Sequence, residues 1–158
     1  MAKGTPAVLA LGSAGVEFAV HEFAHEPSSR NYGVEAAEAL GVEHDRVFKT
    51  LLADVLGIGQ VVAVVPVTGQ LSLRELAAAV GGKRAEMCPP AVAERLTGYV
   101  VGGISPFGQK RRLPTVIDET AELWDTIFVS GGRRGLDLEL APQALIDVLD
   151  ATVWAIGT

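Results

Sequence analysis

Residues 47–67 read VFKTLLADVLGIGQVVAVVPV, two apolar runs rich in Val and Leu on either side of a glycine-containing bend at 57–60. Apolar runs of this length that flank a Gly-rich bend are typical of two paired β-strands. We therefore predict strands over 47–56 and 61–67. We expect this hairpin to form the core of the fold.

Shorter segments with strand and helix patterns surround the hairpin. Strands are predicted at 16–20, 83–87, 99–101, 114–117, 126–129 and 136–140, helices at 6–11, 34–40, 76–80, 89–96 and 142–149, and a last apolar segment follows at 152–156. Neither a repeat nor a linker interrupts this mixed order. The pattern predicts one α+β domain over 1–158, with six or seven short strands in one sheet or open barrel and about five helices around it.

The composition is that of a folded chain without a membrane span. Of 158 residues, 49% are hydrophobic and 20% are charged, which is typical of a compact domain rather than a disordered segment. The longest apolar run, 61–67, is far shorter than the roughly 20 residues that a membrane helix needs. The N-terminus is a poor secretory signal, so the cytoplasm is the expected location.

The charge balance argues against a general nucleic-acid binder. The formal net charge is -6, which repels a phosphate backbone. Positive charge is nevertheless concentrated in two short clusters, Lys110 to Arg112 and the pair Arg133 and Arg134. They are either a local basic patch or ordinary charged residues on solvated loops.

Several familiar kinds of active site lack support in the sequence. His21 and His25 fall on or beside a predicted strand, where four positions separate them by roughly 13 Å, too far to share a metal ion. The glycine-rich stretches 103–110 and 131–135 depart from the phosphate-loop and dinucleotide-binding patterns. The single cysteine, Cys88, precedes two prolines and is interpreted as a helix-entry residue rather than a nucleophile. Neither a metal nor a cofactor is predicted.

Other residues remain as candidates for a site. Lys49 interrupts an apolar strand, where a charge either serves a cavity or sits at an edge facing water. The loop 102–106 has the form G-x-x-x-P, and its glycine allows close approach of a ligand to the backbone, although a structural bend would look the same. Ser130 and Asp137 flank a turn and are predicted to face the same end of the sheet, or else to belong to an ordinary hairpin.

A set of short motifs together resembles the YbaK/EbsC family. The motifs are KTLL at 49–52, GQL at 69–71, GYVVGGISP at 98–106, GQK at 108–110, LPT at 113–115 and SGGRRGLD at 130–137. The match follows nearly the whole chain, and the order and spacing of the motifs make it specific. It is most similar to the stand-alone cysteinyl-tRNA(Pro) deacylases, which are relatives of the editing domain of bacterial prolyl-tRNA synthetases.

The resemblance implies a mixed, barrel-like sheet of six to seven strands with helices around it, and a set of site residues. The catalytic positions that it implies are Lys49, Gly102 and Asp137, and the substrate-binding positions are Phe23, Tyr32, Thr50, Gly103, Ile104, Ser105, Pro106 and Ser130. In this set Thr50 is the neighbour of Lys49 in the pocket. Phe23 stands where close relatives often carry Tyr, so a role for that hydroxyl does not transfer.

The implied activity is removal of a wrong amino acid from the terminal adenosine of a tRNA. Among the possible substrates, the resemblance favours Cys-tRNA(Pro). Because the sequence offers no convincing general base or nucleophile, we favour a route in which the cysteine thiol of the substrate attacks its own ester. The implied partners are the acceptor end of the aminoacyl-tRNA and, transiently, prolyl-tRNA synthetase. The alternative is a non-catalytic module that binds aminoacyl-tRNA or a synthetase.

Overall fold

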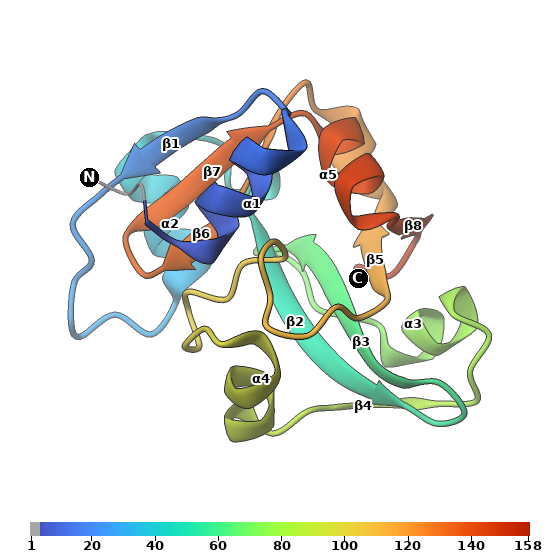
Figure 1. Ribbon diagram of the computed structural model, residues 1–158. Helices are drawn as coiled ribbons and strands as arrows, with labels where there is room; N and C mark the ends of the chain where they lie inside the picture. Colours follow the sequence, from blue (N-terminus) through green and yellow to red (C-terminus); the bar gives the residue numbers. More distant parts are fainter. Residues whose placement is uncertain (1–3) are drawn as a thin grey trace.

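The strands form two sheets in the computed structural model, which describes residues 4–158 (Figure 1). One sheet has the order β1-β7-β6 and the other the order β4-β2-β3-β5-β8. The strands are β1 (Ala19–Glu22), β2 (Phe48–Val55), β3 (Gly59–Pro66), β4 (Ala85–Met87), β5 (Thr115–Asp118), β6 (Ile127–Arg133), β7 (Leu136–Leu140) and β8 (Thr152–Trp154). The larger sheet is mixed, because β5 pairs parallel with both β3 and β8.

The predicted hairpin is confirmed. β2 pairs antiparallel with β3 over its whole length, from Phe48 opposite Pro66 to Val55 opposite Gly59. Most side chains of both strands are buried, because sheet faces on either side of the hairpin are covered. The hairpin is therefore the centre of the larger sheet, as its apolar composition predicts.

The expectation of one barrel-like sheet is wrong. Neither sheet closes, and the two meet at one isolated parallel bridge between Val47 and Phe128. Past this bridge β2 continues along β3 and pairs with β4 only from Ala53 onward. The edge of β2 over residues 48–52 consequently faces no neighbouring strand.

Five α-helices cover the sheets within residues 4–158. They are α1 (Pro6–Ala14), α2 (Tyr32–Leu40), α3 (Leu73–Ala79), α4 (Pro90–Thr97) and α5 (Pro142–Leu149), and two short 3₁₀ helices occupy His44–Arg46 and Glu119–Leu123. Two of these helices begin at a capping hydroxyl, since the Thr5 hydroxyl accepts from the N–H of Val8 and the Ser72 hydroxyl accepts from the N–H of Glu75. No helix in this described part of the chain is long and apolar enough to cross a membrane.

Three apolar clusters hold the elements together. The largest joins the inner faces of both sheets to α1, α4 and α5, and includes Leu11, Phe107 and Leu145. The second lies between α3 and the outer face of the larger sheet, and the third lies between α2 and the smaller sheet. Figure 1 shows α1 over the smaller sheet, α5 beside β5 and β8, and α3 and α4 near the larger sheet.

Two predicted strands differ in the structure. The first strand is Ala19–Glu22 rather than 16–20, because its pairing with β7 begins at Ala19 opposite Glu139. Residues 99–101 form no strand. α4 ends at Gly98 with a left-handed backbone, and the N–H of Gly103 then donates to the carbonyl of Val100, so the chain turns twice within six residues.

Candidate functional site

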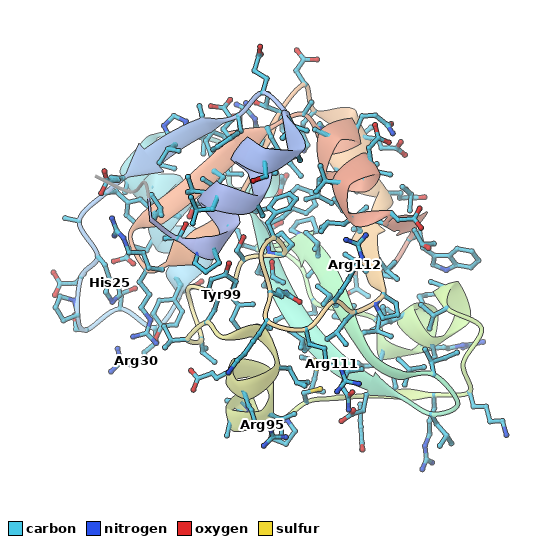
Figure 2. All side chains as sticks on the ribbon, viewed as in Figure 1. His25, Arg30, Arg95, Tyr99, Arg111 and Arg112 are labelled. Carbon is cyan, nitrogen blue, oxygen red and sulfur yellow. The ribbon has the colours of Figure 1, made fainter. Side chains whose placement is uncertain are left out.

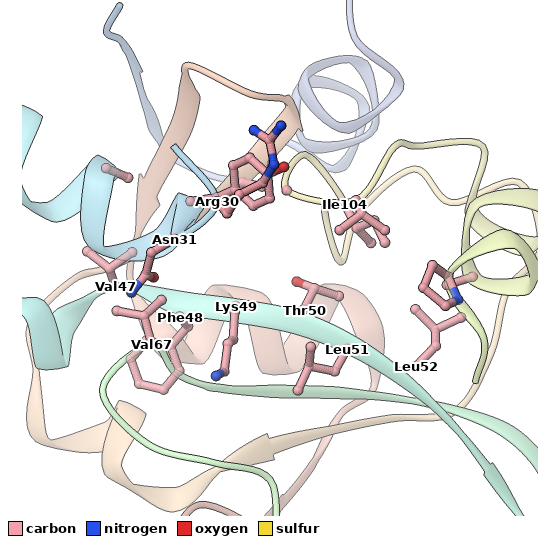
Figure 3. Close-up of a pocket in the computed structure, with 18 of the residues that line it drawn as sticks. Arg30, Asn31, Val47, Phe48, Lys49, Thr50, Leu51, Leu52, Val67 and Ile104 are labelled. Atoms are coloured by element: carbon pink, nitrogen blue, oxygen red, sulfur yellow. The ribbon is translucent and has the colours of Figure 1, made fainter. Parts of the chain in front are cut away.

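A cavity of about 390 Å³ lies where the open edge of β2 meets the first turn of α2, the smaller sheet, the 101–104 loop and the start of α4 (Figure 3). Its lining consists of Arg30, Asn31, Tyr32, Gly33, Ala36, Val47, Phe48, Lys49, Thr50, Leu51, Leu52, Val67, Met87, Cys88, Pro90, Ala93, Val101, Gly102, Ile104, Ser130 and Asp137. Most of these side chains are apolar, and the few polar ones converge from separate elements. This is the composition of a small-ligand pocket.

The open edge of β2 presents backbone groups to this cavity. Odd-numbered residues of β2 direct their backbone groups to β3, as the bond from the N–H of Val67 to the carbonyl of Val47 shows. Even-numbered residues point the other way, where the Leu52 carbonyl accepts from the N–H of Cys88. Thr50 is the middle of the three even-numbered residues between the bridge at Val47 and the start of the β4 pairing at Ala53, so its N–H and C=O point away from β3 and toward the cavity.

Thr50 also brings a buried hydroxyl to the cavity. Its side chain is 8% exposed, and its Oγ1 has no hydrogen-bond partner among residues 4–158. In Figure 3 this oxygen points from β2 toward the side on which Ile104 and Arg30 lie. Buried hydroxyl groups nearly always have a partner, so this one indicates a polar group on a bound ligand.

Asp137 supplies a second buried polar group. It lies on β7, opposite Ser130 of β6 and His21 of β1, and is 6% exposed. Burial raises the pKa of its carboxyl to about 7, because no cation or hydrogen-bond donor of the described chain offsets the lost hydration. The His21 imidazole does not compensate it, since Nε2 lies 2.9 Å from Oε1 of Glu139 instead. A carboxyl that titrates near neutral pH in a cavity is suited to proton exchange.

Lys49 lies on the opposite face of β2 from Thr50. Figure 3 shows its side chain on the same side of the strand as Leu51 and pointing away from the Thr50 hydroxyl. Burial lowers the pKa of the Lys49 ammonium, and within residues 4–158 no carboxylate lies within salt-bridge distance of it. Both residues line the cavity because it opens at the strand edge. Lys49 and Thr50 are therefore neighbours in the cavity lining, although their side chains leave β2 on opposite faces.

The 101–104 loop forms the wall opposite β2. Gly102 has a φ of 89°, and a Cβ placed on it would lie 2.6 Å from the Tyr32 ring. Glycine is therefore required at position 102 for two reasons, its left-handed backbone conformation and the packing of Tyr32 against the loop. Ile104 follows and is 8% exposed, which places its side chain between the cavity and the main core.

Seven of the predicted site residues line the cavity and four do not. Those in the lining are Tyr32, Lys49, Thr50, Gly102, Ile104, Ser130 and Asp137, and those outside it are Phe23, Gly103, Ser105 and Pro106. Phe23 packs in the cluster under α2, and its N–H donates to the carbonyl of Gly135. Gly103 lies against the backbone of Arg133, and Ser105 is fully buried with its hydroxyl bonded to the N–H of Phe107. These residues shape the loop rather than the cavity surface.

The segment between β4 and α4 is the part of the lining that sequence reasoning missed. Met87, Cys88, Pro90 and Ala93 form an apolar wall that no motif marks, because their position depends on β4 pairing beside β2. Burial, together with the nearby Asp54 carboxylate, raises the pKa of the Cys88 thiol to about 11. A thiol that stays protonated at neutral pH is a weak nucleophile, in line with its interpretation as a helix-entry residue.

The part of the chain that the structure describes contains no cluster of side chains suited to a metal ion. There, no three His, Cys, Asp or Glu side chains gather closely enough to hold a metal ion. His21 pairs with Glu139, and Nδ1 of His25 lies 2.8 Å from Oε1 of Glu35. The two histidines thus have separate carboxylate partners, on separate elements.

Comparison with known proteins gives consistent matches along the chain. Residues 26–148 match the aminoacyl-tRNA editing domain family. The chain is 43% identical over 122 residues to EbsC of Enterococcus faecalis, a proposed Cys-tRNA(Pro)/Cys-tRNA(Cys) deacylase, covering 77% of this chain and 74% of EbsC. It is 32% identical to the multifunctional Ser/Thr-tRNA deacylase ProXp-y of Escherichia coli over 84% of this chain and 81% of that protein. A crystal structure described as a proposed trans-editing enzyme for prolyl-tRNA synthetase superposes with a TM-score of 0.84 at 27% identity, covering 97% of this chain and 95% of the other.

Proposed function

Because the chain belongs to the aminoacyl-tRNA editing domain family, we propose that it is a trans-editing deacylase that removes a mischarged amino acid, most specifically Cys from Cys-tRNA(Pro). The observation that carries this proposal is the cavity lined by Thr50, whose buried Oγ1 has no hydrogen-bond partner in the described chain, and by Asp137, whose buried carboxyl has a raised pKa. A ligand with an ammonium group and an ester carbonyl satisfies both groups. An aminoacyl ester has this chemistry.

The proposed reaction uses the substrate's own thiol. The cysteine sulfur attacks the ester carbonyl carbon, a C–S bond forms, and the bond between that carbon and the ribose oxygen breaks. The thiol proton ends on the ribose hydroxyl, so the products are a cyclic thiolactone and the free 3′ end of the tRNA. The protein then has only to hold the ester in this geometry and stabilise the oxyanion.

The cavity supports this route through its backbone groups and through Asp137. The N–H of Thr50 faces the cavity and Gly102 lines the opposite wall, and the developing oxyanion is proposed to lie between them. Asp137 has a pKa of about 7, so it is proposed to relay the proton from the thiol to the leaving oxygen. The protonated Cys88 thiol is not assigned a part in the reaction.

Lys49 is proposed to contact the phosphate of the terminal nucleotide. Its ammonium lies on the other face of β2 from Thr50, so it is offset from the aminoacyl group. A substrate that crosses the open strand edge would place the amino acid on the Thr50 side and the nucleotide on the Lys49 side. An ammonium without a carboxylate partner suits a phosphate there.

The proposed RNA-binding surface is α4 with the loop that follows Gly98. Arg95, Lys110, Arg111 and Arg112 are exposed there, and none makes a salt bridge within residues 4–158. Figure 2 shows Arg30, Arg95 and Arg111 in the lower part of the view, around α4. These few cations suit the acceptor end of a tRNA, and a transient complex with prolyl-tRNA synthetase is proposed to supply further contacts. The cytoplasm, where aminoacyl-tRNA is made, is the proposed location.

A deacylation assay with Cys-tRNA(Pro) and purified protein tests the proposal. We expect multiple turnovers and release of a thiolactone that a thiol reagent or mass spectrometry identifies. The alternative of a non-catalytic module predicts binding in a fixed ratio without turnover, and that result would reject the enzyme. A chain that releases Ser or Thr but not Cys would keep the deacylase and reject the cysteine assignment.

A further inference from the structure

The backbone of Val101, which precedes Gly102 in the cavity wall, is held by two side chains of opposite charge. Its N–H donates to Oε2 of Glu94 at 2.8 Å, and its carbonyl accepts from Nε and Nη2 of Arg134 at 2.9 and 2.6 Å. Glu94 comes from α4 and Arg134 from the turn between β6 and β7. Two elements far apart in the sequence therefore meet on one peptide of the loop.

Arg134 also fixes the ring against which the loop packs. Its guanidinium carbon lies 4.5 Å from the centre of the Tyr32 ring, which a cation–π contact permits. Gly102 packs against the same ring, so closely that a Cβ on Gly102 would lie 2.6 Å from it. Arg134, Tyr32 and the loop are thus packed as one unit at the cavity wall.

We propose that Arg134 and Glu94 are positioning residues for deacylation, because they hold Val101 and thereby set the place of Gly102 in the cavity. This inference rests on the proposed function for its kinetic consequence, but the clamp itself is a property of the fold. Neither side chain is in the cavity lining, so neither touches the substrate in this arrangement. They act through the loop backbone.

The contacts of Arg133 and Arg134 differ from both interpretations that the sequence left open, a local basic patch or charged residues on solvated loops. Arg133 forms an ion pair with Glu22 at 2.6 Å, and Arg134 donates to the carbonyl of Val101. The fork of Arg134 uses two nitrogens on one carbonyl while its flat face covers Tyr32. A lysine cannot reproduce this geometry, whereas it can replace an arginine that only supplies charge to a phosphate.

The test compares Arg134→Lys, Arg134→Gln and Glu94→Ala with the matched control Arg133→Gln, which changes the adjacent exposed arginine. For both Arg134 variants and for Glu94→Ala we expect kcat to fall roughly tenfold to a hundredfold, because the loop at Gly102 would no longer be held in place. We expect KM to stay within about threefold of the wild type. We expect the salt dependence of kcat/KM to stay unchanged. Arg133→Gln should match the wild type.

Amide hydrogen exchange gives a readout that does not depend on activity. The N–H of Val101 should exchange at least about tenfold faster in Arg134→Gln and Glu94→Ala than in the wild type or Arg133→Gln, while amides of β2 and β3 keep their protection, which shows that the fold is intact. Wild-type kcat in Arg134→Lys, or a flatter salt dependence in Arg134→Gln, would overturn the clamp in favour of a phosphate contact. Unchanged exchange at Val101 would overturn it outright. If the wild type does not deacylate any aminoacyl-tRNA, the proposed function fails and the exchange data alone decide the clamp.

Discussion

The side chains of Lys49 and Thr50 lie on opposite faces of β2, although the two residues are adjacent in the chain (Figure 3). Alternation along a strand makes this unavoidable. Both still line one cavity, because β2 has no strand neighbour over 48–52 and the cavity opens at that edge. A ligand that reaches both side chains has to cross the edge of the sheet.

The first prediction concerns Lys49. We expect Lys49→Ala to lower deacylation about a hundredfold or more, because the ammonium is proposed to hold the terminal phosphate, while the free energy of unfolding changes by less than about 1 kcal/mol. The small effect on stability follows from the absence of an ion pair to Lys49 in the described chain. Single-turnover kinetics and urea unfolding measure the two effects. Lys83→Ala, which removes an exposed lysine outside the cavity and outside the proposed RNA-binding surface, is the control, and equal rates in the two variants would reject the role of Lys49.

The second prediction concerns the pH dependence of stability. The unfolded state releases the Asp137 proton near pH 4 and the folded state near pH 7, so the folded state binds more protons between these values. The contribution of Asp137 to the stability of the wild type should therefore fall as the pH rises from about 4 to 7 and stay lower above pH 7. The full difference is on the order of 4 kcal/mol, since each pKa unit corresponds to about 1.4 kcal/mol.

Asp137→Asn should remove this contribution. The amide is neutral at every pH, so we expect the variant to be more stable than the wild type at pH 8 and of similar stability at pH 4. We also expect it to lose most of its deacylation activity, because it cannot exchange a proton. Urea unfolding at the two pH values measures the stability. A variant less stable than the wild type at pH 8 would show that the Asp137 carboxyl has a partner in the folded state.

The third prediction concerns the wall at Gly102. Gly102→Ala places a methyl group against the Tyr32 ring in a left-handed backbone, so we expect a loss of about 1–3 kcal/mol in stability and a clear drop in kcat. Gly12→Ala is the matched control, because nothing lies within 4 Å of a Cβ there and the residue is inside α1, where Ala is the better helix former. It should stabilise the protein slightly and leave turnover unchanged. Normal activity of Gly102→Ala would make the loop purely structural.

The sequence predicts elements well where one local pattern decides the outcome. The hairpin of β2 and β3 follows from its two apolar runs, and the start of α3 from Ser72 and Glu75. The strand predicted at 99–101 fails because Gly98 ends α4 in a left-handed conformation and a turn follows. A short apolar triplet has no pattern that separates a strand from a buried turn.

Prediction of the site was limited by long-range packing. The motifs identify Asp137 and Thr50, but the open edge between them depends on where β4 begins to pair, at Ala53. That position is set by tertiary packing, and so is the position of the cavity wall around Cys88. Arg134 shows the same limit, since a charge pattern cannot distinguish an arginine that binds RNA from one that holds the carbonyl of Val101.

The fourth prediction concerns the substrate. If the substrate's thiol attacks its own ester, Ser-tRNA should be deacylated at least about a hundredfold more slowly than Cys-tRNA, since a hydroxyl of nearly the same size is a much poorer nucleophile. The comparison uses one tRNA charged with either amino acid. Similar rates would indicate attack by water or by a ribose hydroxyl.

The last prediction concerns the choice of tRNA. With Arg133 paired with Glu22 at the surface and Arg134 bound to the carbonyl of Val101, the exposed cations around α4 are few, and the chain carries a net charge of -6. A domain of this length has a radius of gyration of about 15 Å, so it spans the acceptor end of a tRNA but not the anticodon, some tens of ångströms away. We therefore expect the isolated protein not to contact the anticodon, which differs between tRNA(Pro) and tRNA(Cys).

We accordingly expect the isolated protein to deacylate Cys-tRNA(Pro) and Cys-tRNA(Cys) with kcat/KM values within about threefold of each other. Selectivity for tRNA(Pro) should appear when prolyl-tRNA synthetase is added, because the proposed complex would leave recognition of the anticodon to the synthetase. The measurement compares both tRNAs with and without the synthetase at one fixed salt concentration, since phosphate contacts weaken as salt rises. A reversal of charge at Arg111 and Arg112 should lower the rate on both tRNAs equally. A strong preference of the isolated protein for tRNA(Pro) would mean that it contacts more of the tRNA than its few exposed cations allow.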